Sequence, residues 1–323
     1  MHARWLGVWL CLLSGCWAGG NALAQAYPHK PIKFVVGYPP GGSGDFVTRT
    51  VGEAIAEELG QTAVIDNRPG AAGNLASEFV SKSAPDGYTL LVGSNPYINK
   101  ALYKKLPYDI EKDFQPVSLL GNGPMVIAVN GNLPVNNIKE LVAYAKKNPN
   151  KMNFGSSGNG SAPHLAGILF NSVAETDMLH IPFKGGADAL QAVLGGHVDV
   201  LVDSSSWAPH VEAGKLNLLA TWGEQRTSRF KDTPTLKDAG FNVVVDAPNG
   251  IGAPKGLDAA VSARLRQAFR VAVASAEFKQ ACDKIDAPVL YLDGPDYENY
   301  VAQVYKKETL LIDKLKLKEL VKN

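Results

Sequence analysis

The sequence predicts an α/β protein built from two lobes, each with a mostly parallel sheet covered by helices. Short β-branched or aromatic runs alternate with amphipathic helical patterns along most of the chain, which is the order expected of βαβ units. Two glycine-rich loops, at 38–45 and 154–161, each lead from a predicted strand into a predicted helix. Removal of the first 24 residues leaves about 300, which is enough for two hydrophobic cores.

The first unit begins with a strand at 32–36, a short run that is apolar except for Lys33. A helix follows at 45–59, and Gly60 is expected to end it because glycine readily adopts the left-handed conformation after a helix. The same signals then predict, in order, strand 63–65, helix 74–83 and strand 88–92.

A second unit begins at the apolar run 125–129, and its glycine-rich loop is followed by Pro163, which suits a first helical turn. Its further elements are expected at 138–147, 163–173 and 187–194 (helices), and at 151–154, 178–183, 198–202 and 216–221 (strands).

The chain is then expected to return to the first lobe through Gly250–Ile251–Gly252–Ala253–Pro254. Helices predicted at 258–275 and 297–317 would pack on that lobe. We therefore expect a discontinuous lobe formed by 25–124 plus 247–323, and a continuous lobe formed by 125–246.

The first 24 residues have the pattern of a secretory signal peptide. Arg4 supplies a basic start, residues 5–13 are apolar, and Ala22-Leu23-Ala24 forms an A-x-A cleavage site. The apolar run is too short to span a bilayer. The segment 13–16 also has lipobox form, so lipidation of Cys16 is the alternative. With either processing we expect the mature chain outside the cytoplasm, in the periplasm.

Charge and cysteine content exclude further classes. The chain has 32 Lys and Arg against 31 Asp and Glu, and cleavage after Ala24 removes only Arg4, which leaves 31 of each. A nucleic-acid-binding protein normally carries a basic face, so this balance argues against one. Cys282 is the one cysteine after residue 24, so no intramolecular disulfide is predicted and Cys282 is expected to be buried.

The sequence predicts neither a metal site nor a cofactor. His197, Asp199 and Asp203 alternate on a predicted strand and share a face, but the chain has no H-E-x-x-H motif and no paired cysteines. The first glycine-rich loop lacks the full G-x-G-x-x-G pattern of dinucleotide binding. Asp203 lies at a strand end, where α/β sheets bind ligands, so a position in a cleft and a helix N-cap are both open for it.

The first glycine-rich loop is a candidate anion site. Backbone N–H groups at a helix N-terminus point toward a ligand, and the helix dipole favours negative charge. Gly41, Gly42 and Gly44 allow close approach of the backbone. Ser43 or Asp45 can cap the helix, and Asp45 is expected to hold the loop in shape through backbone N–H groups. An ordinary capped turn is the alternative.

The second glycine-rich loop adds hydroxyl donors from Ser156, Ser157 and Ser161, and His164 follows it closely. A serine beside a histidine raises the alternative of an exported hydrolase that uses Ser157 and His164. The spacing is not G-x-S-x-G, which argues against the nucleophile elbow of that class. Capping or packing is therefore the expected role of His164.

Taken together, the motifs of this chain resemble those of the Bug family, the extracytoplasmic solute receptors of tripartite tricarboxylate transporters. The resemblance covers essentially the whole mature chain, in order and with suitable spacing. It is carried by YPPGGSGD at 38–45, NRPGAAGN at 67–74, PDGYTL at 85–90, LPYD at 106–109, FGSSGNG at 154–160, HLAG at 164–167, PFKGG at 182–186, LGGHVD at 194–199 and AGKL at 213–216.

The resemblance implies a type II periplasmic binding protein that holds a small carboxylate in a cleft between its lobes. Carried over residue by residue, it implies that the ligand contacts backbone groups and hydroxyls of both loops. The implied ligand-binding residues are Tyr38, Pro40, Gly41, Gly42, Ser43, Gly44, Asp45, Ser94, Asn95, Ser156, Ser157, Gly158, Asn159, Gly160, Ser161, His164, Gly185, Gly186 and Asp203.

The implied partners are integral-membrane permease subunits, and the receptor itself is expected to be a monomer without enzymatic activity. A receptor that reports ligand occupancy to a membrane sensor kinase is a further alternative. The chain departs from the family pattern at Phe183, where tyrosine is frequent, and at His197, where glutamine is frequent. Phe183 removes a hydroxyl donor, so the resemblance leaves the recognition of the distal end of the ligand open.

Overall fold

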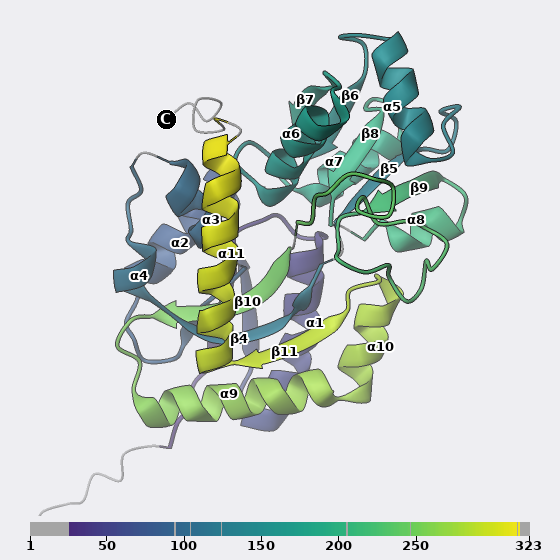
Figure 1. The fold of residues 1–323 in the computed structure, drawn as a ribbon. Helices are drawn as coiled ribbons and strands as arrows, with labels where there is room; N and C mark the ends of the chain where they lie inside the picture. Colours follow the sequence, from purple (N-terminus) through teal and green to yellow (C-terminus); the bar gives the residue numbers. More distant parts are fainter. Residues whose placement is uncertain are drawn as a thin grey trace, which may run out of the picture.

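The computed structural model describes residues 26–93, 95–103, 105–123, 125–204, 206–245, 247–314 and 316, and for 95–98 only the backbone. The signal peptide, its cleavage site at Ala24 and the alternative lipidation site Cys16 lie outside the described residues. Figure 1 shows two α/β lobes, one above the other, with the long helix α11 standing beside both. The two-lobed α/β fold predicted from the sequence is confirmed.

The lower lobe, called lobe 1, contains a sheet of six strands in the order β11-β4-β10-β3-β1-β2. β1 pairs in parallel with β2 and β3, whereas β10 pairs antiparallel with β3 and β4, and β11 antiparallel with β4. The strands are β1 (Ile32–Val36), β2 (Ala63–Asn67), β3 (Thr89–Val92), β4 (Phe114–Asn122), β10 (Pro248–Pro254) and β11 (Val289–Asp293).

The upper lobe, called lobe 2, contains a sheet of five strands in the order β7-β6-β8-β5-β9. β6 pairs in parallel with β7 and β8, and β5 pairs antiparallel with β8 and β9. The strands are β5 (Val126–Asn130), β6 (Asn153–Ser156), β7 (Leu179–Pro182), β8 (Val200–Asp203) and β9 (Leu216–Thr221).

The sheets are therefore mixed and not mostly parallel, which corrects one part of the predicted fold class. The reason is the route of the chain between the lobes. β4 carries it out of lobe 1 toward β5, and β10 brings it back, so these two strands run in opposite directions and pair antiparallel. The order of strands and helices along the chain does not predict this antiparallel pairing, because it describes only local βαβ units.

Helices cover both sheets. Those of lobe 1 are α1 (Ser43–Leu59), the 3₁₀ turn η1 (Ala71–Gly73), α2 (Asn74–Ser81), α3 (Asn95–Leu102), α4 (Ile110–Asp113), α9 (Ala259–Ala274), α10 (Ala276–Lys284) and α11 (Gly294–Lys314). Those of lobe 2 are α5 (Ile138–Lys147), α6 (Ala162–Ala174), α7 (Gly186–Leu194) and α8 (Ala208–Glu212). Within the described part of the chain no helix has both the length and the apolarity to cross a bilayer.

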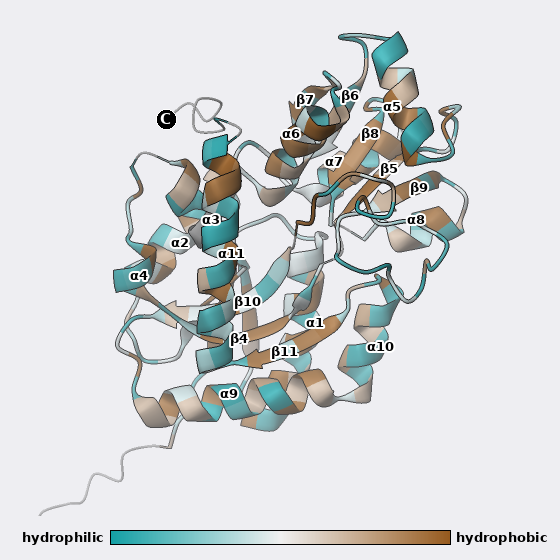
Figure 2. Ribbon diagram, viewed as in Figure 1, coloured by the Kyte–Doolittle hydropathy of each residue, from teal (hydrophilic) through white to brown (hydrophobic). Residues whose placement is uncertain are grey.

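Each lobe has its own hydrophobic core. In lobe 1, α1 and α9 both pack on one face of β1, where Phe34 meets Phe269 edge to face at 6.1 Å, and Cys282 of α10 belongs to the same cluster. Cys282 is 2% exposed, so its predicted burial is confirmed, and burial raises the pKa of its thiol to about 12. In lobe 2, side chains on the two faces of the sheet form separate clusters. In Figure 2 the ribbons of β5 and β8 are brown, the colour of hydrophobic residues.

Candidate functional site

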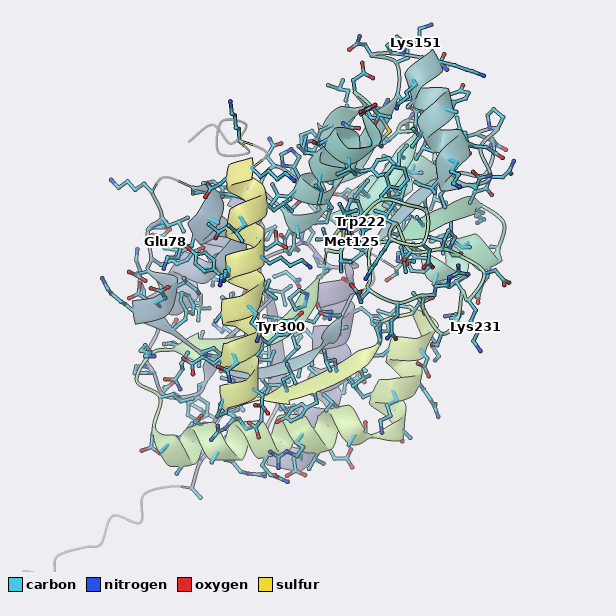
Figure 3. The ribbon with its side chains drawn as sticks, viewed as in Figure 1. Glu78, Met125, Lys151, Trp222, Lys231 and Tyr300 are labelled. Carbon is cyan, nitrogen blue, oxygen red and sulfur yellow. The ribbon has the colours of Figure 1, made fainter. Side chains whose placement is uncertain are left out.

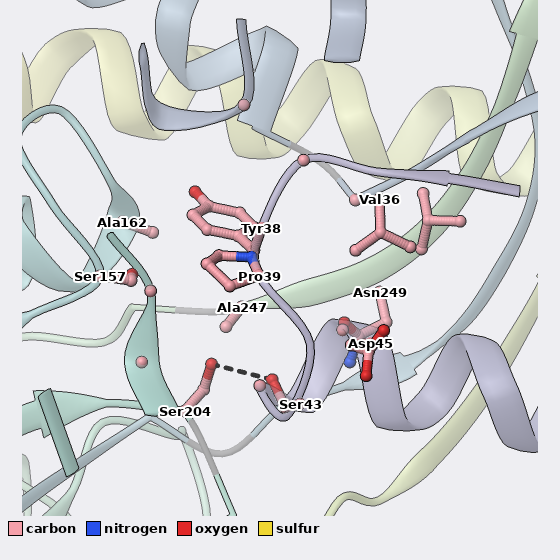
Figure 4. Close-up of a pocket in the computed structure, with 18 of the residues that line it drawn as sticks. Val36, Tyr38, Pro39, Ser43, Asp45, Ser157, Ala162, Ser204, Ala247 and Asn249 are labelled. Atoms are coloured by element: carbon pink, nitrogen blue, oxygen red, sulfur yellow. Dashed lines mark hydrogen bonds between the residues drawn. The ribbon is translucent and has the colours of Figure 1, made fainter. Parts of the chain in front are cut away.

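The lobes enclose a cleft with two connected parts. The inner chamber, of ≈ 100 Å³, lies between the N-terminus of α1 in lobe 1 and the N-terminus of α7 in lobe 2 (Figure 4). The outer basin, of ≈ 1160 Å³, continues from it past Tyr38 and Ser157, which border both parts. The lobes touch beside the chamber, where the hydroxyl oxygens of Ser43 and Ser204 lie 3.3 Å apart. The two lobes are therefore in direct contact at the chamber in this structure.

Many of the predicted ligand-binding residues border this cleft. Those that line the inner chamber are Tyr38, Gly42, Ser43, Gly44, Asp45, Ser157, Gly185, Gly186 and Asp203. Those that line the outer basin are Tyr38, Ser157, Gly158 and Asn159. Residues from segments more than a hundred positions apart thus meet around one space, as a cleft between two lobes requires.

The first glycine-rich loop presents an open helix N-terminus to the chamber. Gly42 is the N-cap of α1, in an extended conformation, and no side chain caps the helix. The first N–H groups of an α-helix have no partner within it, so those of residues 43–45 are available to a ligand. The helix dipole adds a partial positive charge at the same point.

Asp45 holds this loop and does not itself offer a positive group. Its carboxylate accepts hydrogen bonds from the backbone N–H of Gly41 at 3.0 Å and the amide of Asn67 at 2.9 Å, and the Arg49 guanidinium binds both of its oxygens at 3.0 Å. Burial raises the pKa of Asp45, but these hydrogen bonds from Arg49, Gly41 and Asn67 outweigh it and lower the pKa. The predicted shaping role agrees with this geometry.

From lobe 2, the opposing helix N-terminus is that of α7. Its N-cap, Gly185, is extended and no side chain caps the helix, so the N–H groups of residues 186–188 face the chamber without an internal acceptor. A Cβ atom on Gly185 would lie 2.8 Å from Cδ of Pro39 in the other lobe. A Cβ on Gly186 would lie 2.1 Å from Oδ1 of Asp203. Glycine at these two positions therefore allows the lobes, and the Asp203 carboxylate, to come this close.

The second glycine-rich loop is closed by its own groups. Ser161 is the N-cap of α6: its Oγ accepts from the N–H of His164 at 3.3 Å and donates to the carbonyl of Gly158 at 2.7 Å. The N–H of Gly160 donates to Nδ1 of His164 at 3.1 Å, and that of Gly158 to Oγ of Ser156 at 3.2 Å. These contacts occupy several of the donors that the sequence analysis offered to a ligand, whereas Ser157, Gly158 and Asn159 of the same loop still border the cleft.

Several predicted residues consequently stand behind the walls of the cleft. Ser156 and Ser161 are fully buried and His164 is 5% exposed, and neither they nor Gly160 line the chamber or the basin. Pro40 and Gly41 are exposed and are also absent from both linings, and the N–H of Gly41 is bound to Asp45. Ser94 lies outside the described residues, and Asn95 begins α3 without a described side chain.

His164 and His180 form a buried pair that accounts for the serine–histidine signal in the sequence. Their rings stack with centroids 4.0 Å apart, and Nε2 of His180 lies 2.7 Å from Oγ of Ser156. Burial lowers the pKa of His164 to about 4, and burial followed by the charge of His164 lowers that of His180 to about 3. Both rings are therefore neutral at pH 7, and their hydrogen bonds hold the second loop.

The serine and histidine of the hydrolase alternative, Ser157 and His164, are not joined by a hydrogen bond in the described structure. Within the described part of the chain, Ser157 makes no hydrogen bond to a histidine, and Nδ1 of His164 is occupied by the N–H of Gly160. The serine that does meet a histidine, Ser156, is fully buried and out of reach of a substrate. No cluster of three or more His, Cys, Asp or Glu among the described residues has the arrangement of a metal site.

The sequence reasoning missed some residues of the chamber, among them Pro39, Ala187, Ser204 and Asn249. Pro39 and Ala187 adjoin predicted positions, so their place could have been inferred from the glycine-rich motifs. Asn249 comes from β10, the strand that returns to lobe 1, and no local pattern marks it. Among the described lining residues of the chamber there is no lysine, arginine or histidine, whereas Asp45, Asp188 and Asp203 are acidic, so the donors available to an anion there are backbone N–H groups and hydroxyls.

Comparison with known proteins identifies the family. The family model described as "Tripartite tricarboxylate transporter family receptor" matches residues 47–317. The chain belongs to this receptor family. A Cupriavidus necator protein, "UPF0065 protein in gbd 5'region", is 37% identical over 297 residues, which are 92% of this chain and 91% of that protein. The resemblance to the Bug family is confirmed.

Solved structures of related receptors have the same fold. "Structure of a periplasmic transporter" is 34% identical with a TM-score of 0.87, and the periplasmic binding protein BugD is 30% identical with a TM-score of 0.85; each comparison covers 90% of this chain and 99% of the other. A protein of R. palustris with adipate has 27% identity and a TM-score of 0.85, covering 90% of this chain and 98% of that one. MatC of Rhodopseudomonas palustris, with bound malate, has 28% identity and a TM-score of 0.83, covering 88% and 100%.

Proposed function

We propose that this receptor captures a small carboxylate between its lobes and presents it to a membrane permease of the tripartite type. The observation that carries the proposal is the pair of uncapped helix N-termini, those of α1 and α7, which face one chamber from opposite lobes. Each N-terminus carries about half an elementary charge, so the two together can offset about one negative charge. The malate and adipate found with two related receptors are carboxylates of suitable size.

The geometry can supply sufficient binding energy without an arginine or lysine. A hydrogen bond to a charged group contributes about 1.5–3 kcal/mol, and the two helix ends offer several N–H donors. Association costs about 4–15 kcal/mol, and a micromolar Kd corresponds to about −8 kcal/mol. Four or five such bonds, together with burial on closure, reach that value. Ligand that contacts both lobes also favours the closed form, which gives a permease a form to recognise.

The site residues proposed for this role are those of the two open helix ends, 42–45 and 185–188, with Tyr38, Ser157 and Asp203 around them. The lobe boundaries 25–124 plus 247–323 and 125–246 belong to the proposal, as do a monomeric state and export to the periplasm by cleavage after Ala24. A receptor role without catalysis fits the absence of a hydrogen bond between Ser157 and a histidine in the described chain. A neighbouring gene for a permease would favour transport, whereas a neighbouring gene for a sensor kinase would favour sensing.

The experiment is calorimetry on the mature chain, unfolded and refolded to remove ligand retained during purification. The panel contains mono-, di- and tricarboxylates and the neutral amide of each. We expect one or more carboxylates to bind with a Kd in the micromolar range or below, and their amides not to bind. Mass spectrometry of the small molecules released on unfolding should identify a carboxylate. The proposal fails if no carboxylate binds and none is released.

A further inference from the structure

A second contact between the lobes lies away from the cleft. It is formed by Arg229, which follows β9 in a loop of lobe 2. Nε and Nη2 of Arg229 donate to the two carboxylate oxygens of Glu212, at the end of α8 in the same lobe, at 2.8 and 2.7 Å. Nη1 donates to the carbonyls of Asp283 and Lys284, at the C-terminus of α10 in lobe 1, at 2.7 and 2.6 Å. One guanidinium therefore joins the two lobes.

The position of this contact is distinct from the ligand site. The neighbouring cavity, of ≈ 430 Å³, is bordered by Gly123, Met125 and Val245 of the two segments that cross between the lobes. It shares no lining residue with the chamber or the basin among the described residues. In Figure 1, α8 and α10 lie to the right of the crossing segments and α3 to the left, and Lys231 of the same loop is labelled above α10 in Figure 3.

Both ends of the contact are fixed to a hydrophobic core. Phe230, next to Arg229, packs on the fully buried Trp207 of lobe 2 with ring centroids 5.1 Å apart. On the other side, Phe278 and Cys282 anchor α10 in the core of lobe 1. Both partners of the contact are thus attached to the packed core of their own lobe.

The chemistry requires an arginine at this place. Glu212 binds the guanidinium in a bidentate manner and fixes its plane, which leaves Nη1 directed at the last carbonyls of α10. These carbonyls carry the partial negative charge of a helix C-terminus, so the bonds are charge-assisted. A lysine has no planar fork and cannot hold both groups with the same geometry.

We propose that Arg229 is a positioning residue that stabilises the closed form from beside the crossing segments and so slows release of the ligand. The Arg229 contact is present in the structure in which Ser43 and Ser204 meet across the cleft, and the proposal is that it is lost when the cleft opens. This inference depends on the proposed function as a two-lobed receptor. It adds that the affinity is set partly by a residue that does not touch the ligand.

The test compares Arg229→Met with Arg226→Met in the mature chain. Arg226 lies in the same loop and also binds a carboxylate and a carbonyl, those of Asp238 at 2.7 Å and Lys231 at 3.0 Å, but both belong to lobe 2. Spin labels at the exposed positions Glu57 and Lys147 report the distance between the lobes by electron–electron double resonance. Rapid-mixing kinetics with a carboxylate from the calorimetric panel give the on- and off-rates.

We expect Arg229→Met to shift the distance distribution toward the open form and to raise the off-rate about tenfold, the ratio that one charge-assisted hydrogen bond corresponds to. The on-rate and the Arg226→Met variant should stay near wild type. If Arg229→Met does not fold, Arg229→Lys keeps the charge and should show a smaller shift in the same direction. Equal behaviour of the two loop variants overturns the inference. Absence of carboxylate binding would defeat the proposed function, whereas the label distances would still test Arg229.

Discussion

The two glycine-rich loops of this receptor look alike in sequence and differ in the structure. Each connects a strand to a helix and contains glycine and serine. The loop before α1 ends in Gly42 at the N-cap and leaves the helix N-terminus open toward the chamber. The loop before α6 ends in Ser161 at the N-cap, whose side chain accepts the N–H of His164. The residue at the N-cap therefore decides whether the first N–H donors of the helix stay open or are taken up by a capping side chain.

The N-terminus of α7 is open for the same reason as that of α1. Its N-cap is Gly185, again without a capping side chain, and it takes the place opposite α1 that the sequence assigned to α6. An uncapped helix end is slightly less stable, because a serine or aspartate N-cap stabilises a helix more than glycine does, by about a few tenths of a kcal/mol. The open donors are then available to the ligand.

The largest effect is expected when a capping side chain is introduced at the open N-terminus of α1. Gly42→Asp places a carboxylate at the N-cap of α1, where a Cβ has no atom within 4 Å and the backbone is extended, so the side chain can cap the helix. We expect carboxylate affinity to fall by about 100-fold or more, because the cap takes the donors and repels the ligand, while stability stays equal or rises. Calorimetry and thermal unfolding measure the two effects.

The matched control for this change is Gly42→Ala, which adds the Cβ without a capping group and should bind within about threefold of wild type. Loss of binding in both variants would mean that the Cβ itself is responsible, and the comparison of the loops would not hold.

A second prediction concerns the histidines that hold the closed loop. The pKa values of His164 and His180 are lowered to about 4 and about 3, whereas in the unfolded chain they are near 6.5. As pH falls below 6.5 the unfolded state gains protons that the folded state does not, so the free energy of unfolding decreases between pH 7 and 5, on the order of 2 kcal/mol for each histidine and 4 kcal/mol for the pair. Urea unfolding as a function of pH measures this.

The control is the double variant His164→Gln/His180→Gln, in which the pH dependence over this range should be smaller by the same amount. An unchanged slope between pH 7 and 5 would show that other groups produce it and that the histidine pair is not buried as a neutral unit.

A third, smaller effect is expected at the open α7 end. In Gly185→Ala the added Cβ would meet Pro39 of the other lobe at 2.8 Å, so closure is hindered while the separated lobes are unaffected. We expect about tenfold weaker binding and a larger radius of gyration by small-angle scattering at saturating ligand. The stability of the ligand-free protein should remain near wild type.

Gly186→Ala provides the contrast for Gly185→Ala, because its Cβ would lie 2.1 Å from Asp203 in the same lobe. It should destabilise the protein with or without ligand. Equal stability losses in the two variants would show that Gly185 serves the fold of lobe 2 and not the closure of the cleft.

The smallest effect is expected from the cap of the closed loop. Ser161→Ala removes the side chain that accepts from His164 and donates to Gly158, which should lower the free energy of unfolding by about 1 kcal/mol. Because Ser161 does not line the cleft, affinity should change by less than about threefold. A large loss of affinity at unchanged stability would mean that the second glycine-rich loop contacts the ligand through Ser161.

Local pattern was sufficient for much of the fold. The strands at 32–36 and 216–221 and the helix at 138–147 have the predicted bounds, because each is a short apolar or amphipathic run between clear end signals. β4 was missed: Pro116 and Gly121 interrupt its pattern, and its pairing with β10 and β11 supplies the stability that local propensity lacks. β11 was also missed, because it is a short strand of five residues without a clear alternation of buried and exposed positions.

What the sequence alone determined is the family, the two-lobed α/β class and the place of the first glycine-rich loop at the cleft, because these follow from ordered motifs and local periodicity. The tertiary structure decided the mixed order of the sheets and the identity of the opposing helix end. It also decided that Ser156, Ser161 and His164 stabilise a loop instead of lining the cleft. Such outcomes depend on which hydrogen bonds are already satisfied when distant segments meet, and spacing along the chain does not contain that information.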